Sequence, residues 1–208
     1  MSTSHQVLVL SKEASGESFL KLHLLGAELG CQLCLKHIAT KNQSSKSAPD
    51  LFDTAEVQID TSKQGTAQFI REYEITRRRS DIGLNYRSLQ HASNLSRLVI
   101  HNGSHLPDLP ALYRLMERSI DAFAAGSEPS LVFFKALYLL LKEEGYPVRE
   151  SWWEQLPNSL RSDARTLLAQ PSPQSLPSEI RAVCEASAQN LMHWLRRETD
   201  LILPSGIL

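Results

Sequence analysis

The hydrophobic pattern of this 208-residue chain changes period once, near residues 76–83, and this change constrains the fold more than any other feature. Before it, short runs alternate between apolar and polar residues; in residues 19–25, for example, leucine occupies positions 20, 22 and 24. After it, apolar residues recur at the spacing of a helix. A period of two is typical of half-buried strands, and a period near 3.6 of amphipathic helices. We therefore expect an α+β protein in which an all-β domain precedes an all-α domain.

Five strands are predicted in the first 79 residues, at positions 6–10, 19–25, 31–39, 56–60 and 66–75. Turn-forming or polar segments rich in Gly, Ser and Asn separate them. A closed barrel of five short antiparallel strands leaves no strand edge exposed, and the OB fold is such a barrel. Residues 1–79 are therefore predicted to form an OB-fold domain that binds nucleic acid.

Residues 80–208 are predicted to form an all-helical domain. Its expected helices cover residues 84–100, about 110–125, 130–144, 159–169 and 177–199. Ser80 or Asp81 is the expected N-cap of the first helix. The helix at 130–144 is apolar almost all round, which predicts that it lies at the centre of the domain.

Composition argues against a strongly electrostatic protein. The chain carries 22 Lys and Arg against 23 Asp and Glu, a net charge of −1, so binding to nucleic acid depends on local clusters of charge. Three cysteines and the lack of a signal-peptide pattern indicate a reduced, cytoplasmic protein. No apolar run has the length that a membrane span needs.

The motifs that would indicate an enzyme are missing. Phosphate-binding loops, dinucleotide fingerprints, zinc-protease helices and nucleophile elbows do not occur, so we expect no catalytic activity, cofactor or small-molecule substrate. Cys31 and Cys34 have the spacing of half a zinc site or of a redox pair. Strand residues three apart point to opposite faces, so we expect one of these thiols in the core and no metal site.

The first candidate nucleic-acid contact follows the third predicted strand into its loop. Its residues are Lys36, His37, Lys41 and Lys46. This strand and its loops belong to the face with which OB barrels bind nucleic acid, and lysines there can neutralise phosphates. Ordinary solvated lysines in a polar loop are the alternative.

The second candidate contact lies at the predicted domain boundary. It comprises Arg71 on the last strand and the consecutive Arg77, Arg78 and Arg79. Arginines can bind phosphates through two hydrogen bonds each. They can equally pair with nearby acids and hold the two domains together; the candidates are Glu72, Glu74 and Asp81.

Aromatic residues and one lysine complete the candidate positions. Phe69 and Tyr73 are an even number of residues apart, so we expect them to share a face of the last strand and to pack in the core. Trp152 and Trp153 are adjacent and cannot both be buried on one helix face, so one is expected in the core and the other in a surface groove that binds a protein partner. Lys135 is a candidate for binding the carboxylates of such a partner.

The order of several short motifs resembles the RecO family of recombination mediators. The motifs are the first predicted strand with Gly16-Glu17-Ser18, the segment from Gly65-Thr66 to Arg71-Glu72, and the helix from Leu131 that ends at Gly145-Tyr146-Pro147. The resemblance covers residues 5–200. It implies an OB barrel and a RecO-type helical domain, binding and annealing of single- and double-stranded DNA, and partnership with RecR. It also implies loading of RecA onto strands coated with single-strand binding protein (SSB), whose acidic C-terminal tail docks on the helical domain.

Two departures from the family qualify these expectations. Residues 148–153 contain none of the cysteines that form a zinc finger in many RecO proteins, so no zinc is expected. The basic loop after the third strand is diluted to residues 37–41, which include one lysine. The leading interpretation is a DNA-binding mediator of the RecF repair pathway, associated with the nucleoid. The alternative is a protein-interaction adaptor with the same fold and little DNA affinity of its own.

Overall fold

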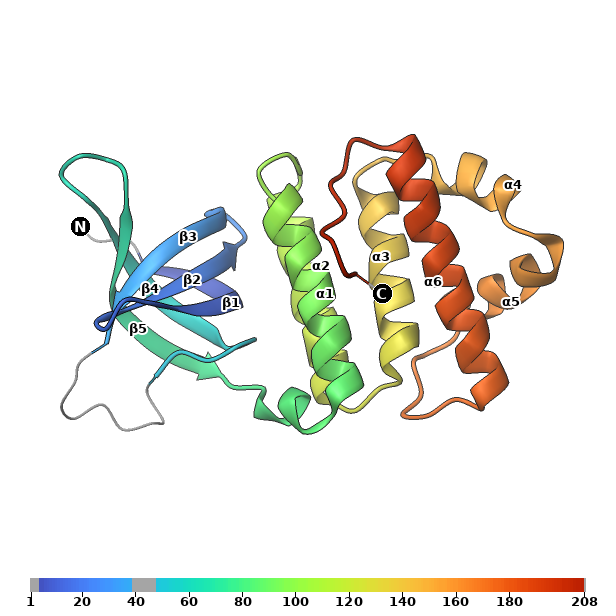
Figure 1. The fold of residues 1–208 in the computed structure, drawn as a ribbon, viewed down its shortest axis with the longest axis horizontal. Helices are drawn as coiled ribbons and strands as arrows, with labels where there is room; N and C mark the ends of the chain where they lie inside the picture. The colour runs from blue at the N-terminus through green and yellow to red at the C-terminus, as the bar shows by residue number, and fades with distance from the viewer. Residues whose placement is uncertain (1–3, 39–47, 208) are drawn as a thin grey trace. The chain divides into compact units, whose positions relative to one another are not determined.

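The chain folds into two compact units, Met1–Ser80 and Asp81–Leu208. This computed structural model describes residues 4–38 and 48–207. The first unit is a closed five-stranded barrel and the second consists of helices (Figure 1). The predicted fold class, an N-terminal OB barrel followed by an all-helical domain, is therefore confirmed. The sequence analysis placed the boundary one residue earlier, after Arg79.

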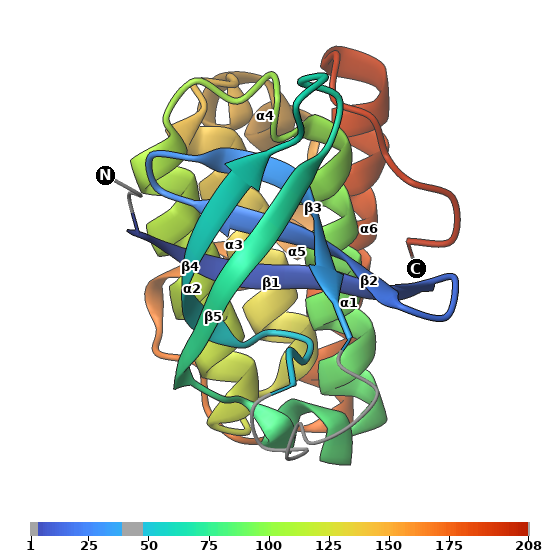
Figure 2. The same ribbon diagram turned by 90° about the vertical axis from the view of Figure 1, so that its left-hand side faces the viewer.

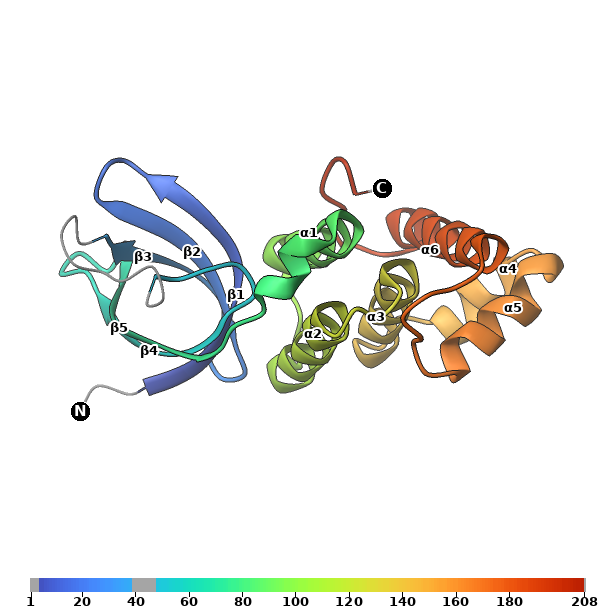
Figure 3. The same ribbon diagram turned by 90° about the horizontal axis from the view of Figure 1, so that it is seen from below.

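The barrel follows the strand order β1-β2-β3-β5-β4, with β4 returning to β1. Its strands are β1 (Ser4–Ser15), β2 (Phe19–Gly26), β3 (Gly30–His37), β4 (Thr54–Thr61) and β5 (Gln68–Arg77). Strands β3 and β5 pair in parallel and the other neighbours pair antiparallel. Figure 2 shows β4 and β5 crossing β1 and β2 at a steep angle, and Figure 3 shows the sheet curving round on itself.

Every strand contributes alternate side chains to the barrel core. Val7 and Val9 come from β1, Leu22 and Leu24 from β2, Cys34 from β3, Ala55 and Val57 from β4, and Ile70 from β5. The leucines that alternate in β2 therefore face inward, as their period of two predicts. The residues between them face away from this core; some, such as Leu8, are buried on that side too, and others, such as Lys21, are exposed.

A β-bulge at Arg71 interrupts the alternation of β5. Ile59 of β4 lies opposite Ile70, but its neighbour Gln58 lies opposite Glu72, so Arg71 is the extra residue. Ile70 and Tyr73, three residues apart, consequently both pack on the core. The prediction that Phe69 and Tyr73 share a face is wrong, because the bulge shifts the alternation by one residue between them.

The second unit contains the helices α1 (Tyr86–Asn102), α2 (Leu109–Ala124), α3 (Pro129–Glu143), α4 (Trp153–Gln155), α5 (Asn158–Ala169) and α6 (Ser178–Glu198). A 3₁₀ turn, η1 (Ser80–Leu84), precedes α1, and a π-helical turn, η2 (Val148–Trp152), precedes α4. The N-cap of α1 is Asn85, whose side chain accepts hydrogen bonds from the backbone N–H groups of Arg87 and Ser88. The predicted cap at Ser80 or Asp81 is wrong because those residues form the separate turn η1.

Helix α3 is the centre of the helical unit, as its apolar circumference predicts. It packs against α1, α2 and α6, and Figure 3 shows it between these helices. Phe133, Phe134 and Leu137 are each at most 1% exposed. Helices on several sides are needed to cover a helix with no polar face.

An ionic network around the buried Glu128 joins α1, the start of α3 and α6. Glu128 is 3% exposed and lies 3.2 Å from Arg181 and 3.6 Å from Arg87. Arg87 also bonds Glu185 at 2.6 Å. Each charge in this network has an opposite charge beside it, which offsets the loss of hydration on burial.

His91, one turn along α1 from Arg87, is buried against Phe133, with ring centroids 5.2 Å apart. Burial, reinforced by the charge of Arg87 and opposed by Glu185 and Glu128, lowers the pKa of His91 from 6.5 to about 4. The folded chain therefore holds this imidazole neutral where the unfolded chain protonates it, and stability falls as the pH drops from about 6.5 towards 4. We expect wild type to lose on the order of 2 kcal/mol to this group between about pH 7 and pH 4.5, and His91→Gln to abolish that part of the loss.

Denaturant unfolding of both proteins across this pH range measures the difference. His193→Gln is the matched control, because His193 is exposed on α6. Parallel pH profiles for wild type and H91Q contradict the assignment.

Candidate nucleic-acid interface

The outer surface of β2, β3 and β5 carries a continuous set of aromatic, aliphatic and basic side chains. Because Leu22, Leu24 and Cys34 point into the barrel, the residues on either side of them in sequence point out. We call this surface the aromatic face and define it by Phe19, Lys21, Leu33, Leu35, His37 and Phe69. In the strand register Phe19 lies opposite His37, Lys21 opposite Leu35, and Leu35 opposite Phe69.

The three rings of the aromatic face form one cluster. The Phe19 ring lies 5.3 Å from the His37 ring at an interplanar angle of 83°, and 6.1 Å from the Phe69 ring at 61°. These edge-to-face contacts hold the rings in place. Phe19 and Phe69 are partly exposed, His37 is exposed, and Leu33 is 45% exposed. The face therefore presents ring surface on which unpaired bases can stack.

Sequence reasoning missed most of this face. It placed Phe69 in the core, and it gave no role to Phe19 or Lys21. The signal that was available is that Phe19 occupies the polar side of an alternating strand, opposite the leucines, where an aromatic residue has no packing reason to be. The position of Phe69 had no such signal, because it depends on the bulge.

The basic residues that were predicted to bind nucleic acid from β3 and its loop make different contacts. Lys36 points its ammonium group at the backbone of β5, where Nζ donates to the carbonyl oxygens of Arg71 at 3.2 Å and Ile70 at 3.5 Å. Burial lowers the pKa of Lys36, and the neighbouring Glu72 opposes this shift. Lys36 thus binds carbonyl groups beside the bulge, whereas His37 belongs to the aromatic face. Lys41 and Lys46 lie outside the described residues.

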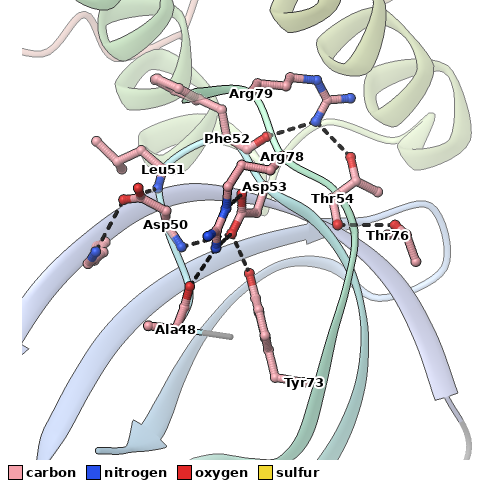
Figure 4. Close-up of polar contacts among 11 residues, drawn as sticks. Ala48, Asp50, Leu51, Phe52, Asp53, Thr54, Tyr73, Thr76, Arg78 and Arg79 are labelled. Atoms are coloured by element: carbon pink, nitrogen blue, oxygen red, sulfur yellow. Dashed lines mark hydrogen bonds and ion pairs between the residues drawn. The ribbon is translucent and has the colours of Figure 1, made fainter. Parts of the chain in front are cut away.

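Arg78 binds a buried carboxylate (Figure 4). Its Nε donates to Asp53 Oδ1 at 3.1 Å and its Nη2 to Asp53 Oδ2 at 2.9 Å. The Asp53 side chain is 0% exposed. It also accepts bonds from the Tyr73 hydroxyl and the Asp50 N–H, and Arg78 adds a bond of 2.6 Å to the Ala48 carbonyl. This doubly bonded pair ties the segment before β4 to the end of β5.

Arg79 also binds this segment, through a buried side chain. It is 4% exposed, and its Nη1 donates to the Phe52 carbonyl at 2.7 Å and to Thr54 Oγ1 at 2.8 Å (Figure 4). Phe52 has a positive φ of 66°, an unfavourable backbone conformation for a bulky residue, and these contacts hold its carbonyl. The predicted nucleic-acid role of Arg79 is therefore corrected to a structural one, because its side chain is buried. Arg78 also has a structural partner, but its side chain is partly exposed and its contact with nucleic acid stays a prediction. The carboxylate that Arg78 meets is Asp53, which the sequence analysis did not single out.

Exposed charges of both signs lie on β4, β5 and the turn between them. Arg71 and Arg77 are exposed, and so is Lys63 in the turn between β4 and β5. The outward residues Glu56 and Asp60 make β4 acidic. On β5 the exposed Glu72 and Glu74 balance the charges of Arg71 and Arg77.

The predicted partner residue Lys135 lies in a groove of the helical unit. We call it the α2–α3 groove; its volume is about 260 Å³. Arg114 and Arg118 of α2 line it with Lys135, together with aliphatic residues that include Leu115 and Leu139. Lys135 donates to the Gln170 carbonyl, and burial lowers its pKa. One acid, Glu143, also lines the groove. Because the three cations outnumber it, the groove suits an acidic peptide with an apolar end.

The two adjacent tryptophans differ in burial, as their adjacent positions predict. Trp152 is 0% exposed, and its Nε1 donates to Asn190 Oδ1 at 2.9 Å. Its assignment as a partner-binding residue is corrected, because the ring lies entirely in the core. Trp153 is partly exposed and lines a separate groove.

The cysteines take no part in a metal site within residues 4–38 and 48–207, where no three His, Cys, Asp or Glu side chains are placed to hold an ion. Cys34 is in the barrel core and Cys31 is partly buried on the other face of β3. Burial raises the pKa of each to about 11, so both are protonated thiols at neutral pH.

Within residues 4–38 and 48–207, no helix has the length and apolar character to cross a membrane.

Removing Arg78 and neutralising Asp53 are expected to lower the free energy of unfolding by different amounts. Arg78→Ala leaves a fully buried carboxylate without its counter-charge, and we expect it to lower the free energy of unfolding by about 3–5 kcal/mol. Asp53→Asn leaves an arginine whose side chain is 30% exposed and can turn to water, so its effect is smaller. Urea unfolding measures both.

Arg71→Ala is the matched control for R78A. Arg71 is an exposed arginine on β5, the strand that Arg78 follows, and its removal should change stability by less than about 0.5 kcal/mol. An R78A protein as stable as R71A refutes the structural role.

Comparison of the sequence with models of protein families gives no match. A search of the curated proteins also finds no match.

Proposed function

We propose that the chain binds single-stranded nucleic acid through the aromatic face of its barrel and acts as a recombination mediator of the RecO type. The observation that carries the proposal is the cluster of Phe19, His37 and Phe69 on the outside of β2, β3 and β5. Strands 2 and 3 are the surface on which OB barrels bind oligonucleotides. The order of motifs that resembles the RecO family supports the mediator role.

The aromatic face favours stacking over charge as the source of affinity. Each base that stacks on an aromatic side chain contributes about 1–3 kcal/mol, whatever its sequence. Lys21, Lys63 and Arg71 supply exposed positive charge on the same unit, while Lys36, Arg78 and Arg79 are bound to the barrel itself. A strand held in this way is not read for sequence, and its bases remain exchangeable, which is what annealing and handover to a recombinase require.

A specific observation also favours the adaptor function. The α2–α3 groove offers Arg114, Arg118 and Lys135 beside aliphatic side chains. The SSB tail expected from the family resemblance is acidic, so this groove is our candidate for its docking site. A chain that binds both the tail and the strand is a mediator, and one that binds the tail alone is an adaptor.

Removing the rings of the aromatic face tests the stacking proposal. We expect Phe69→Ala and Phe19→Ala each to weaken binding of a fluorescent single-stranded oligonucleotide by about 5- to 150-fold, since each removes a stacking surface. Fluorescence anisotropy across a salt series measures the affinity.

Two controls accompany this measurement. Phe69→Tyr keeps the ring and should keep most of the affinity, and Tyr86→Ala removes a ring that is 75% exposed on the helical unit. Few phosphate contacts imply a shallow salt slope, since each contributes about −0.7 for a single strand. Unchanged affinity in F19A and F69A, or a slope as steep as for six or more phosphates, argues against stacking.

Charge reversal in the α2–α3 groove tests the adaptor function. Arg114→Glu with Arg118→Glu should weaken binding of a peptide with the acidic C-terminal sequence of SSB by at least about tenfold, because like charges then face each other. Isothermal titration calorimetry measures the affinity.

The control is Arg196→Glu with Arg197→Glu, which makes the same change of charge on exposed positions at the end of α6. An equal loss of peptide affinity in both double variants shows a general effect of net charge and contradicts the groove as the docking site. Tight peptide binding by a chain that binds no oligonucleotide identifies an adaptor.

A further inference from the structure

A second groove of the helical unit is lined by aromatic and arginine side chains. Its lining consists of Tyr138 from α3, Arg149 and Trp153 from the turns at 148–155, and Arg165, Leu168 and Ala169 from α5. We call it the Trp153 groove. Its volume is about 400 Å³, within the range of small-ligand sites. The lining contains two arginines and no acid.

The groove is preformed. Trp152 anchors the turn beneath it, because its ring is fully buried and bonded to Asn190 of α6. A second bond to α6 runs from Trp194 Nε1 to Ser151 Oγ at 3.1 Å. The Trp153 ring rests edge-on against Trp152, with centroids 5.2 Å apart at 62°. The exposed part of Trp153 is therefore held in position before any ligand binds, which lowers the entropic cost of binding.

The arginines of the groove carry charge that the protein does not neutralise. The Arg165 guanidinium carbon lies 5.9 Å from the centre of the Trp153 ring. Within the described residues the side chains of Arg149 and Arg165 make no ion pair or hydrogen bond, in contrast to Arg78, Arg87 and Arg181. Two unneutralised guanidinium groups beside indole and phenol rings suit a ligand that combines a planar group with a negative charge.

We propose that the Trp153 groove binds one nucleotide of a single-stranded nucleic acid, with the base stacked on Trp153 and the phosphate bound by Arg149 and Arg165. The identity of the ligand rests on the function proposed above. An acidic peptide fits this lining less well than it fits the α2–α3 groove, whose apolar residues are aliphatic. Aromatic rings and guanidinium planes both stack on bases, and they occur together here.

Tryptophan fluorescence of the full chain reports this site selectively. The chain has three tryptophans, and two of them are buried, Trp152 at 0% and Trp194 at 3% exposure. A short oligothymidylate that stacks on Trp153 should quench the emission saturably. Arg149→Ala with Arg165→Ala should abolish the quenching and weaken binding in a parallel anisotropy titration by about tenfold. Arg196→Ala with Arg197→Ala is the matched control and should preserve both signals.

Each outcome separates this inference from the barrel proposal. Binding by anisotropy without quenching, and with full affinity in R149A/R165A, overturns the Trp153 groove and leaves the aromatic face standing. Quenching that survives F19A and F69A at unchanged affinity supports the groove and overturns the face. Quenching by an acidic peptide and not by the oligonucleotide overturns the nucleotide assignment in favour of a protein partner. Absence of any oligonucleotide binding overturns both proposals.

Discussion

The bulge at Arg71 is the constraint on which the barrel depends. It shifts β5 by one residue, so that Ile70 and Tyr73 both reach the core and Phe69 turns outward. The inward Tyr73 donates its hydroxyl to Asp53, the carboxylate that binds Arg78 and closes the segment before β4 onto the strand. The outward Phe69 completes the ring cluster on β2 and β3. One extra residue therefore determines both the internal support and the position of Phe69 on the proposed binding surface.

Eight arginines of the chain illustrate two physical classes. Arg78, Arg79, Arg87 and Arg181 are bound to carboxylates or carbonyls and stabilise the units that contain them. Arg114, Arg118, Arg149 and Arg165 line grooves of the helical unit. Because a guanidinium group binds carboxylates, carbonyls and phosphates through the same N–H groups, residue type does not distinguish the classes. The burial of each side chain and the position of its partner distinguish the two classes.

The helical unit offers two grooves with different chemistry. The α2–α3 groove combines cations with aliphatic side chains, and the Trp153 groove combines arginines with aromatic rings. A mediator has to recognise a protein-coated strand and also the strand itself. If these grooves bind an acidic tail and a base, as we propose, the two ligands can be bound at once, whereas a single basic surface would make them compete.

The sequence by itself determined the order of the two domains, the course of the strands and helices, and the central position of α3, because these follow from a hydrophobic period that is local to each segment. It also determined that the two adjacent tryptophans cannot both be buried on one helix face. Only the tertiary structure decided which side of β5 carries Phe69, because a bulge arises from pairing with another strand. Only the tertiary structure decided the roles of Lys36, Arg78 and Arg79, because their partners come from distant segments; Asp53 is 25 residues from Arg78 in the chain. A charged side chain can bind a ligand only where the fold brings no opposite charge or hydrogen-bond partner to it. The local sequence pattern carries no information about partners that come from distant segments.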